Sequence, residues 1–292
     1  MIKREDGVTY IATISFGKDS TVMCDLLLKN GYPVDYIVFN DTLDEFDLMY
    51  EYKIKVEKYF KDRYEKEVVT LLPNRNFNDS VMRTVKNSKN EERNGQSVGL
   101  PVANGEAMCH LRKTLKENPF DSWLRKTIKK QKYKKYIGFT NEESGRAKKS
   151  DINLYPLIDY FNMSELDCKQ YLINQEMENP LYKYFNRTGC AKCPYKSQQD
   201  WWNIYHNFKS VWNDALQIED KLKEQKEYKF FHGNKPLKEW EAHFKQGSLF
   251  DFSDEPLKDC FCKIWYITEC EKHLWGIIKF NGLLTMKVWN MR

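Results

Sequence analysis

Apolar positions in the first part of the chain alternate between two patterns. Short β-rich runs at residues 8–14, 34–40 and 67–72 are separated by stretches at 19–31 and 45–64, where apolar residues recur at helical spacing. This alternation predicts an α/β fold with a parallel sheet and helices on both faces. Right-handed crossovers bring the carboxyl ends of such strands to one edge, where ligands gather.

The next part of the chain is less regular. Residues 71–104 lose the periodicity and are rich in Asn, Lys, Ser and Gly, which predicts an irregular loop that we interpret as a mobile cover. Helical spacing returns at 105–131. Residues 134–141 and 152–159 predict a fourth and a fifth strand, and the helix after them has Ser164 as a candidate cap.

The last third of the chain has a different character. Residues 201–225 predict a strongly helical segment with aromatic side chains along one stripe, and a short helix is mixed after about residue 230 with β-like runs such as 261–268. We therefore interpret residues 1–200 as the α/β domain and residues 201–292 as a helical and mixed extension.

Composition narrows the class of protein. With 41% hydrophobic residues the chain fills a real core, and its short, interrupted apolar stretches predict a cytoplasmic protein with no membrane segment. A net charge of +5 suits anionic ligands without distinguishing a nucleotide from a nucleic acid. The eight cysteines are better explained as free thiols or metal ligands than as disulfides.

The segment SFGKDS, residues 15–20, lies between the first strand and the first helix. Amides at a helix N-terminus and the helix dipole favour a bound phosphate. Gly17 allows close approach of the backbone, Ser15 and Ser20 offer hydroxyls, Lys18 offers a charge, and Asp19 could hold magnesium or cap the helix. The alternative is an ordinary strand-to-helix turn with a capping Asp-Ser pair.

Here the sequence resembles a known family. SFGKDS is similar to the SGGKDS-type loop of the ATP pyrophosphatases, in particular of the phosphoadenosine phosphosulfate (PAPS) reductase superfamily, and the second strand ends in VFNDTLDEF, similar to that family's DTG segment with Leu43 in place of glycine. The resemblance implies a Rossmann-like, adenine nucleotide alpha-hydrolase-like fold. It also implies that residues 15–20, Phe16 included, and Asp41 and Thr42 bind ATP or PAPS with Mg²⁺.

Further segments agree in the same order along the chain. YIGFTNEESGR resembles the family's Glu-Ser-x-x-Arg segment in a shorter form typical of phage-like members, which makes Glu143 and Arg146 candidates for the nucleotide site. Arginine there could clamp a phosphate or sulfate bidentately. YPLIDY and ENPLYKYFNRTGCAKCP match later family segments, so the resemblance spans about residues 8–200 and favours a phage-like or DNA-phosphorothioation branch.

Three cysteines fit the spacing of the cluster-bearing reductases. Cys109 lies 81 residues before the Cys190-x-x-Cys193 pair, although Met108 occupies the position of a second upstream cysteine. Thiolates at such spacing select an iron-sulfur cluster or zinc. Resemblance to the family therefore implies a metal site at Cys109, Cys190 and Cys193, with a 4Fe-4S cluster favoured and Zn²⁺ as the alternative.

The fourth ligand stays open at this point. Cys168 would complete a four-cysteine set as in the phosphorothioation relatives, His110 would close a zinc site, or the fourth iron would stay open as in related tRNA sulfurtransferases. Lys113 and Lys116 each fit one family spacing for the basic residue that accompanies the cysteines.

Other cysteines and aromatic residues have plainer interpretations. The segment around Cys270 resembles the reductase tail that carries a catalytic cysteine, but its spacing differs, so we interpret Cys270, Cys260, Cys262 and Cys24 as apolar core residues. Aromatic residues of 201–212 could stack on bases, but their helical spacing favours packing.

Together these features predict an enzyme of ATP-dependent sulfur transfer or adenylation, with a nucleotide substrate, a possible sulfur donor protein and a possible nucleic acid acceptor. The catalytic candidates are Lys18, Asp19, Asp41 and Arg146. The alternatives are PAPS reduction proper, or a non-catalytic nucleotide sensor or nucleic-acid-associated protein with a zinc site.

Overall fold

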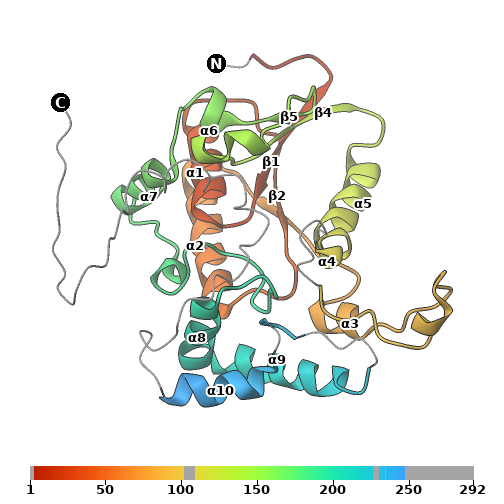
Figure 1. The fold of residues 1–292 in the computed structure, drawn as a ribbon. Helices are drawn as coiled ribbons and strands as arrows, with labels where there is room; N and C mark the ends of the chain where they lie inside the picture. Colours follow the sequence, from red (N-terminus) through yellow and green to blue (C-terminus); the bar gives the residue numbers. More distant parts are fainter. Residues whose placement is uncertain (1–2, 102–108, 226–229, 234, 247–292) are drawn as a thin grey trace, which may run out of the picture.

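A five-stranded parallel sheet forms the centre of the computed structural model, which describes residues 3–101, 109–225, 230–233 and 235–246 (Figure 1). Its order is β3-β2-β1-β4-β5, and every neighbouring pair is parallel. The strands are β1 Val8–Ile14, β2 Tyr36–Asn40, β3 Val68–Leu71, β4 Lys132–Tyr136 and β5 Asn153–Leu154. The α/β prediction is confirmed.

Both faces of the sheet are covered because the central strand is apolar on both. Tyr10, Ala12 and Ile14 of β1 join the core beneath α1 (Lys18–Lys29) and α2 (Asp47–Tyr64). Ile11 belongs to a second cluster, which includes half-buried side chains of α5 (Asn118–Thr127). Figure 1 shows α5 on the opposite side of the sheet from α1 and α2. A strand buried on both sides has the near-continuous apolar pattern seen at residues 8–14.

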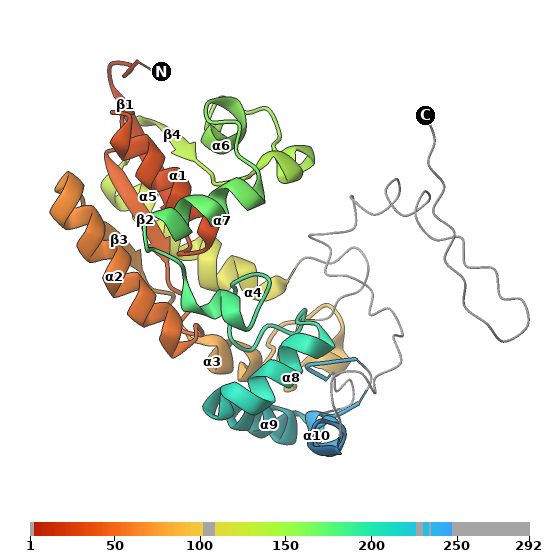
Figure 2. The same ribbon diagram turned by 90° about the vertical axis from the view of Figure 1, so that its left-hand side faces the viewer.

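The helices α6 (Pro156–Asp159) and α7 (Glu165–Asn174) lie on the α1 side of the sheet, as Figure 2 shows. Ser164 caps α7 through a capping box with Asp167, so the predicted cap is confirmed. The remaining helical elements are α3 Phe77–Met82, η1 Glu91–Arg93, α4 His110–Arg112, η2 Lys113–Glu117, η3 Asn141–Arg146, η4 Pro180–Lys183, α8 Gln198–Asn207, α9 Lys209–Leu222 and α10 Leu237–Gln246. Of these, α8, α9 and α10 lie together at the bottom of Figure 1.

The fifth strand is much shorter than predicted. The sequence predicts extended chain over residues 152–159, but only Asn153–Leu154 pair with β4, and α6 begins at Pro156. Proline is pre-organised for the first turn of a helix, where its missing amide costs nothing. The apolar run therefore leaves the sheet at Pro156.

The predicted single helix at 201–225 is two helices. The chain breaks at Phe208, whose backbone leaves helical geometry at φ −132° and ψ 62°. The Phe208 ring packs against Phe46 and Tyr184, with centroids 4.6 and 5.0 Å apart. Trp212 is fully buried and Tyr205 is 9% exposed, so packing explains these aromatic residues.

The segment 71–104 is more structured than predicted. It contains α3, η1 and an isolated antiparallel bridge between Thr84 and Ser97. Phe77, Val81 and Leu100 anchor it in the core. The expectation of an irregular loop is wrong over these stretches, and its mobility stays a prediction.

Helical pattern at 105–131 is confirmed for 110–127, which includes a π-turn at Lys113–Glu117 before α5. The strand expected at 261–268, and Cys260, Cys262, Cys270 and Met108, lie outside the described residues. In the described ranges, no helix combines the length and apolar character that crossing a membrane requires.

Candidate active site

The loop between β1 and α1 is closed by its own serines. α1 begins after Gly17, whose backbone is extended and whose N-cap position has no side-chain hydrogen bond. The Ser20 hydroxyl accepts from the Ser15 amide at 3.1 Å and donates to the Gly17 carbonyl at 3.2 Å. The interpretation of Asp19 as a helix cap is therefore wrong. First-turn amides without a capping side chain favour an anion.

Two non-glycine residues near this edge have left-handed backbones. Phe16 has φ 55° and Leu43 has φ 53°, and these are the positions where the SGGKDS and DTG segments carry glycine. A left-handed conformation costs a side-chain-bearing residue about 1–2 kcal/mol. Phe16 offsets this cost by full burial, with its ring 4.8 Å from that of Phe39, whereas Leu43 is 43% exposed.

The segment that follows η4 covers the loop. The Lys18 amide donates to the Tyr182 hydroxyl at 2.9 Å. A Cβ on Gly17 would lie 3.0 Å from Thr188 Oγ1, so a larger residue requires the Thr188 side chain to shift, and it would lie in ordinary contact with Tyr182 Oη at 3.5 Å. An anion that binds the Lys18 amide must therefore replace the Tyr182 hydroxyl.

Lys18 and Asp19 form a charged cluster with α7 in the described structure. Lys18 Nζ lies 2.9 Å from Glu165 and 3.5 Å from Asp19. Burial lowers the pKa of Lys18, but the bond with Glu165 and the charge of Asp19 raise it further, so its net shift is upward. Burial raises the pKa of Asp19 to about 6, Lys18 opposes this, and Glu165 and Glu143 add to it.

Asp19→Asn is expected to stabilise the protein by about 3 kcal/mol at neutral pH, because the pKa of Asp19 is raised from 3.8 to about 6 and each pKa unit corresponds to about 1.4 kcal/mol. The folded pKa of Asp19 lies above the ordinary value of 3.8. Its stabilising contribution is therefore complete below about pH 4 and is lost as the pH rises through about 6. Urea unfolding at several pH values should show wild type and variant converging in acid. A stability difference that does not change with pH would contradict the assignment.

Asp41 and Thr42 follow β2, next to β1 in the sheet. The Asp41 carboxylate accepts from the Leu43 amide at 2.8 Å and from the Tyr50 hydroxyl at 2.9 Å. The Thr42 hydroxyl donates to Glu45 at 2.7 Å. Both residues are buried within this turn, at the same edge of the sheet as the loop. Their contact with a nucleotide stays a prediction.

The chain after β4 presses directly on α1. A Cβ on Gly138 would lie 2.9 Å from Ser20 Cα and 3.0 Å from Ser20 N. Beyond it, η3 carries Glu143 and Arg146, which form an ion pair with each other, and the Arg146 guanidinium lies 4.5 Å from the centre of the Phe139 ring. Since the Glu143 charge also raises the pKa of Asp19, η3 borders the loop.

Three cysteines from distant parts of the chain meet around Lys116. The charges of Cys190, Glu45, Cys193 and Cys109 raise the pKa of Lys116, and burial opposes them. Burial raises the pKa of the Cys190 thiol to about 12, although Lys116 acts in the opposite direction. Of the two lysines that fit a family spacing for the basic residue near the cysteines, Lys116 is the one that lies beside them. Lys113 is exposed.

The structure does not join Cys168 to these three thiols. Cys168 is buried on α7 and interacts with Asp19, Lys18 and Asp167. Burial lowers the pKa of His110, and its other charged neighbours are Arg93 and Arg83.

The metal hypothesis is supported by the chemistry of the donors more than by their present geometry. Among the described residues, no three His, Cys, Asp or Glu side chains converge closely enough to hold a metal ion. Soft thiols gathered beside a cation still fit an iron-sulfur cluster or zinc in kind. Cys109, Cys190 and Cys193 therefore remain the candidate set, without a fourth ligand.

Sequence reasoning missed several residues of this region. Tyr182, Thr188, Asp44 and Lys192 contact it across long sequence separations. The signal for Gly138 was present, because the sequence predicts it within a strand at 134–141, and glycine inside a strand pattern marks close backbone approach.

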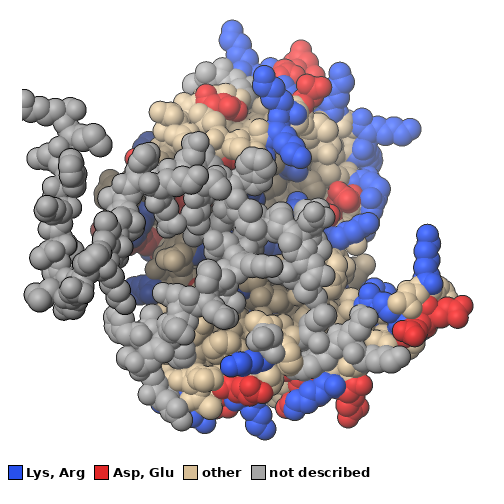
Figure 3. Space-filling model, in the orientation of Figure 1, with Lys and Arg blue, Asp and Glu red and all other residues tan. Residues whose placement is uncertain are grey.

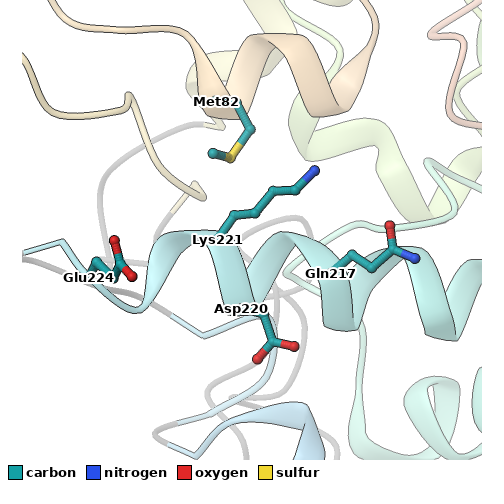
Figure 4. Close-up of a pocket in the computed structure, with 5 residues that line it drawn as sticks. All are labelled: Met82, Gln217, Asp220, Lys221 and Glu224. Carbon is teal, nitrogen blue, oxygen red and sulfur yellow. The ribbon is translucent and has the colours of Figure 1, made fainter.

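Two surface pockets lie away from this site. One, of about 570 Å³, is lined by Met82, Gln217, Asp220, Lys221 and Glu224 (Figure 4). Lys221 extends there from α9 toward Met82 at the end of α3. The other, of about 560 Å³, lies around Tyr32 and Tyr64. No residue predicted for the nucleotide or thiol site lines either pocket.

Fold and site together define a class of protein: an α/β domain with a parallel sheet and an uncapped helix N-terminus at its carboxyl edge. Comparison with family models makes this specific, because the phosphoadenosine phosphosulfate reductase domain matches residues 9–196. The chain belongs to this family, which implies nucleotide binding.

Comparison with solved structures also gives a match. It is the phosphate complex of phosphoadenylyl-sulfate (PAPS) reductase from Candida auris, 18% identical, covering 62% of this chain and 81% of that chain with a TM-score of 0.40. A comparison with the curated proteins finds no match.

Proposed function

We propose that the protein is an enzyme that binds ATP or a sulfonucleotide at the N-terminus of α1 and performs ATP-dependent sulfur transfer or adenylation. The observation that carries the proposal is the first turn of α1, whose N-cap Gly17 provides no capping side chain, at the same sheet edge as Asp41. Family membership supports the nucleotide, and the neighbouring thiols support sulfur chemistry.

In this proposal a substrate oxygen or sulfur attacks the α-phosphorus, the bond to the bridging oxygen breaks, and pyrophosphate leaves with Mg²⁺. Amides of the loop and Lys18 stabilise the negative charge of the departing group. Lys18 is already held at the loop by Glu165, so it is positioned before the nucleotide arrives. Arg146 is exposed on η3, and release of its Glu143 partner would let it clamp a phosphate bidentately.

Cys109, Cys190 and Cys193 would hold the metal centre. A 4Fe-4S cluster there would supply an iron atom for sulfur in transit, and zinc would supply only a structural tie. Lys116 places a positive charge beside thiols that metal binding would deprotonate, and so lowers the cost of forming the thiolates.

Two alternatives follow from the same site. A thiol that attacks the sulfur of PAPS would make the protein a reductase proper, and a nucleotide sensor would bind without turnover. Membership of a phage-like or DNA-phosphorothioation branch is part of our proposal and rests on the short Glu143–Arg146 spacing.

Anaerobically purified protein incubated with ATP and Mg²⁺ tests the function. AMP and pyrophosphate in equal amounts are expected. Adenosine 3′,5′-bisphosphate released from PAPS, without ATP turnover, would favour the reductase. Bound but unconverted ATP would favour the sensor.

Tyr182→Phe is expected to tighten binding of inorganic phosphate or ATP about fivefold, since loss of one competing hydrogen bond corresponds to about 1 kcal/mol. The change frees the Lys18 amide, which now donates to the Tyr182 hydroxyl. Titration calorimetry measures the effect. Tyr184→Phe is the matched control, because its ring packs on Phe208. Weaker binding in Tyr182→Phe alone would instead make the hydroxyl a ligand of the anion.

A nucleic acid partner is favoured by one surface feature. Figure 3 shows Lys and Arg side chains gathered along the edge where Figure 1 places α5 and β4. Neighbouring Arg112 and Lys134 are paired with Glu117 and Glu5. Five exposed cations there make no ion pair with another described residue: Arg125, Lys126, Lys129, Lys130 and Lys132.

Neutralising Lys129, Lys130 and Lys132 to glutamine is expected to weaken single-stranded or duplex DNA binding. It should also reduce the slope of log affinity against log salt by about two to three, because each phosphate contact contributes about 0.7 to 0.9. The same change at Lys53, Lys58 and Lys61 on α2 is the control. Equal losses in both triple variants would show that only bulk charge matters.

A further inference from the structure

Asp44 connects the end of β2 to the Cys-x-x-Cys turn. Its backbone carbonyl accepts from the Ala191 amide at 2.5 Å, and its carboxylate accepts from the Lys192 amide at 3.1 Å. The same carboxylate forms an ion pair with the Lys192 ammonium. Ala191 and Lys192 are the two residues between Cys190 and Cys193, so the turn that carries both thiols is bound to Asp44 at three points.

The contact between Asp44 and Lys192 is buried, and further residues hold Lys192 in place. Asp44 is 4% exposed and Lys192 is 8% exposed. Lys192 also pairs with Asp214 of α9 at 2.8 Å, and Asp214 accepts from Asn78 of α3 at 2.9 Å. A buried ion pair combined with hydrogen bonds from the neighbouring backbone favours one geometry over alternatives. The turn therefore has a fixed position relative to β2.

The five residues after β2 reach all parts of the candidate site. Asp41 and Thr42 lie at the edge beside the loop, Asp44 holds the thiol turn, and Glu45 interacts with both Thr42 and Lys116. A nucleotide that touches Asp41 and Thr42 would thus be linked to the turn that carries the thiols through Leu43, Asp44 and the buried ion pair between Asp44 and Lys192.

We propose that Asp44 is a positioning residue that transmits nucleotide occupancy at the end of β2 to the Cys190–Cys193 turn. This rests on the proposed function for the identity of the ligand. Asp44 touches neither the nucleotide nor the thiol sulfurs in this account; it acts through the Ala191 and Lys192 backbone. A chain without this contact would still bind nucleotide but would lose the register between the nucleotide and the two thiols.

Hydrogen–deuterium exchange of the full chain, read by mass spectrometry on peptides covering residues 188–197, tests the proposal. Asp44→Asn keeps the side-chain shape but removes the charge. Exchange at the Lys192 amide is expected to rise about tenfold, as a charge-assisted bond becomes a neutral one. Lys192→Met removes the ion pair from the other side and should raise exchange in the same direction. Asp214 holds only the Lys192 ammonium and makes no contact with the turn backbone, so Asp214→Asn should raise exchange much less than Asp44→Asn.

A second arm adds ATP and Mg²⁺. In wild type the nucleotide is expected to slow exchange at residues 190–193. In Asp44→Asn this protection should vanish. ATP affinity measured by calorimetry should nevertheless stay within about twofold of wild type, a change of only about 0.4 kcal/mol. If Asp44 had only a structural role, ATP would protect residues 190–193 in Asp44→Asn as it does in wild type.

The outcomes separate this inference from the function. Unchanged exchange in both Asp44→Asn and Lys192→Met, or ATP protection that persists in them, would overturn the role of Asp44. If wild type binds no ATP, the proposed function fails and with it the transmission step, while the arm without ligand still decides whether Asp44 fixes the turn.

Discussion

Gly138→Ala is expected to destabilise the protein by about 1–3 kcal/mol, the range for inserting a methyl group into a packed contact, and to weaken nucleotide binding severely. The new Cβ would lie within 3.2 Å of three backbone atoms in the first turn of α1, two of Ser20 and one of Asp19. Backbone cannot rotate away as a side chain would. The first turn of α1 must shift, and it carries the amides proposed to hold the phosphates.

Gly145→Ala is the matched control for this prediction. Gly145 lies on the neighbouring η3, and its backbone is not left-handed. A methyl group added there would meet no atom within 4 Å. The variant should match wild type in chemical unfolding and in ATP titration. A Gly138→Ala protein with wild-type stability and affinity would show that the chain after β4 and α1 do not approach each other this closely.

Lys116→Met is expected to lower stability by about 3 kcal/mol, because it removes the cation that compensates buried Glu45, and to reduce the bound metal. The charge of Lys116 interacts with Glu45 and with the three thiols. Without it, the main effect that opposes burial is lost, and the pKa values of Glu45 and Cys190 rise further. Because metal ligands must be deprotonated, metal affinity falls at neutral pH.

Lys113→Met provides the comparison, because Lys113 is an exposed cation three residues away. It should retain the stability and the iron or zinc content of wild type, measured by elemental analysis of anaerobic preparations. Equal metal content in Lys116→Met and wild type would contradict a metal site at these thiols. Equal losses in both lysine variants would contradict the specific role of Lys116.

Local patterns were enough to predict most of the sheet. β1 to β4 and their helices follow from alternation of short apolar runs with helical spacing, because central parallel strands are buried on both faces. The predicted length of the fifth strand is wrong, because the apolar run continues into a helix at Pro156. The prediction of one continuous helix at 201–225 is wrong at Phe208. The Phe208 ring packs into an aromatic cluster that includes residues far away in the sequence.

The candidate site was predictable only where a motif is local. SFGKDS and Cys-x-x-Cys are contiguous and were found from the sequence, and Cys109 was found from a family spacing. Contacts such as Tyr182 with Lys18, or Asp44 with Lys192, join residues more than a hundred positions apart and leave no periodic signal. Cys168 has suitable chemistry but the fold places it beside Asp19.

The most direct test of the account is a crystal structure of the protein with ATP and Mg²⁺, with anomalous scattering recorded at the iron and zinc edges. The account predicts phosphate oxygens on the first-turn amides of α1, the Tyr182 hydroxyl displaced from the Lys18 amide, and a metal at Cys109, Cys190 and Cys193. Nucleotide bound elsewhere, with Tyr182 still on the Lys18 amide at saturation, would contradict it.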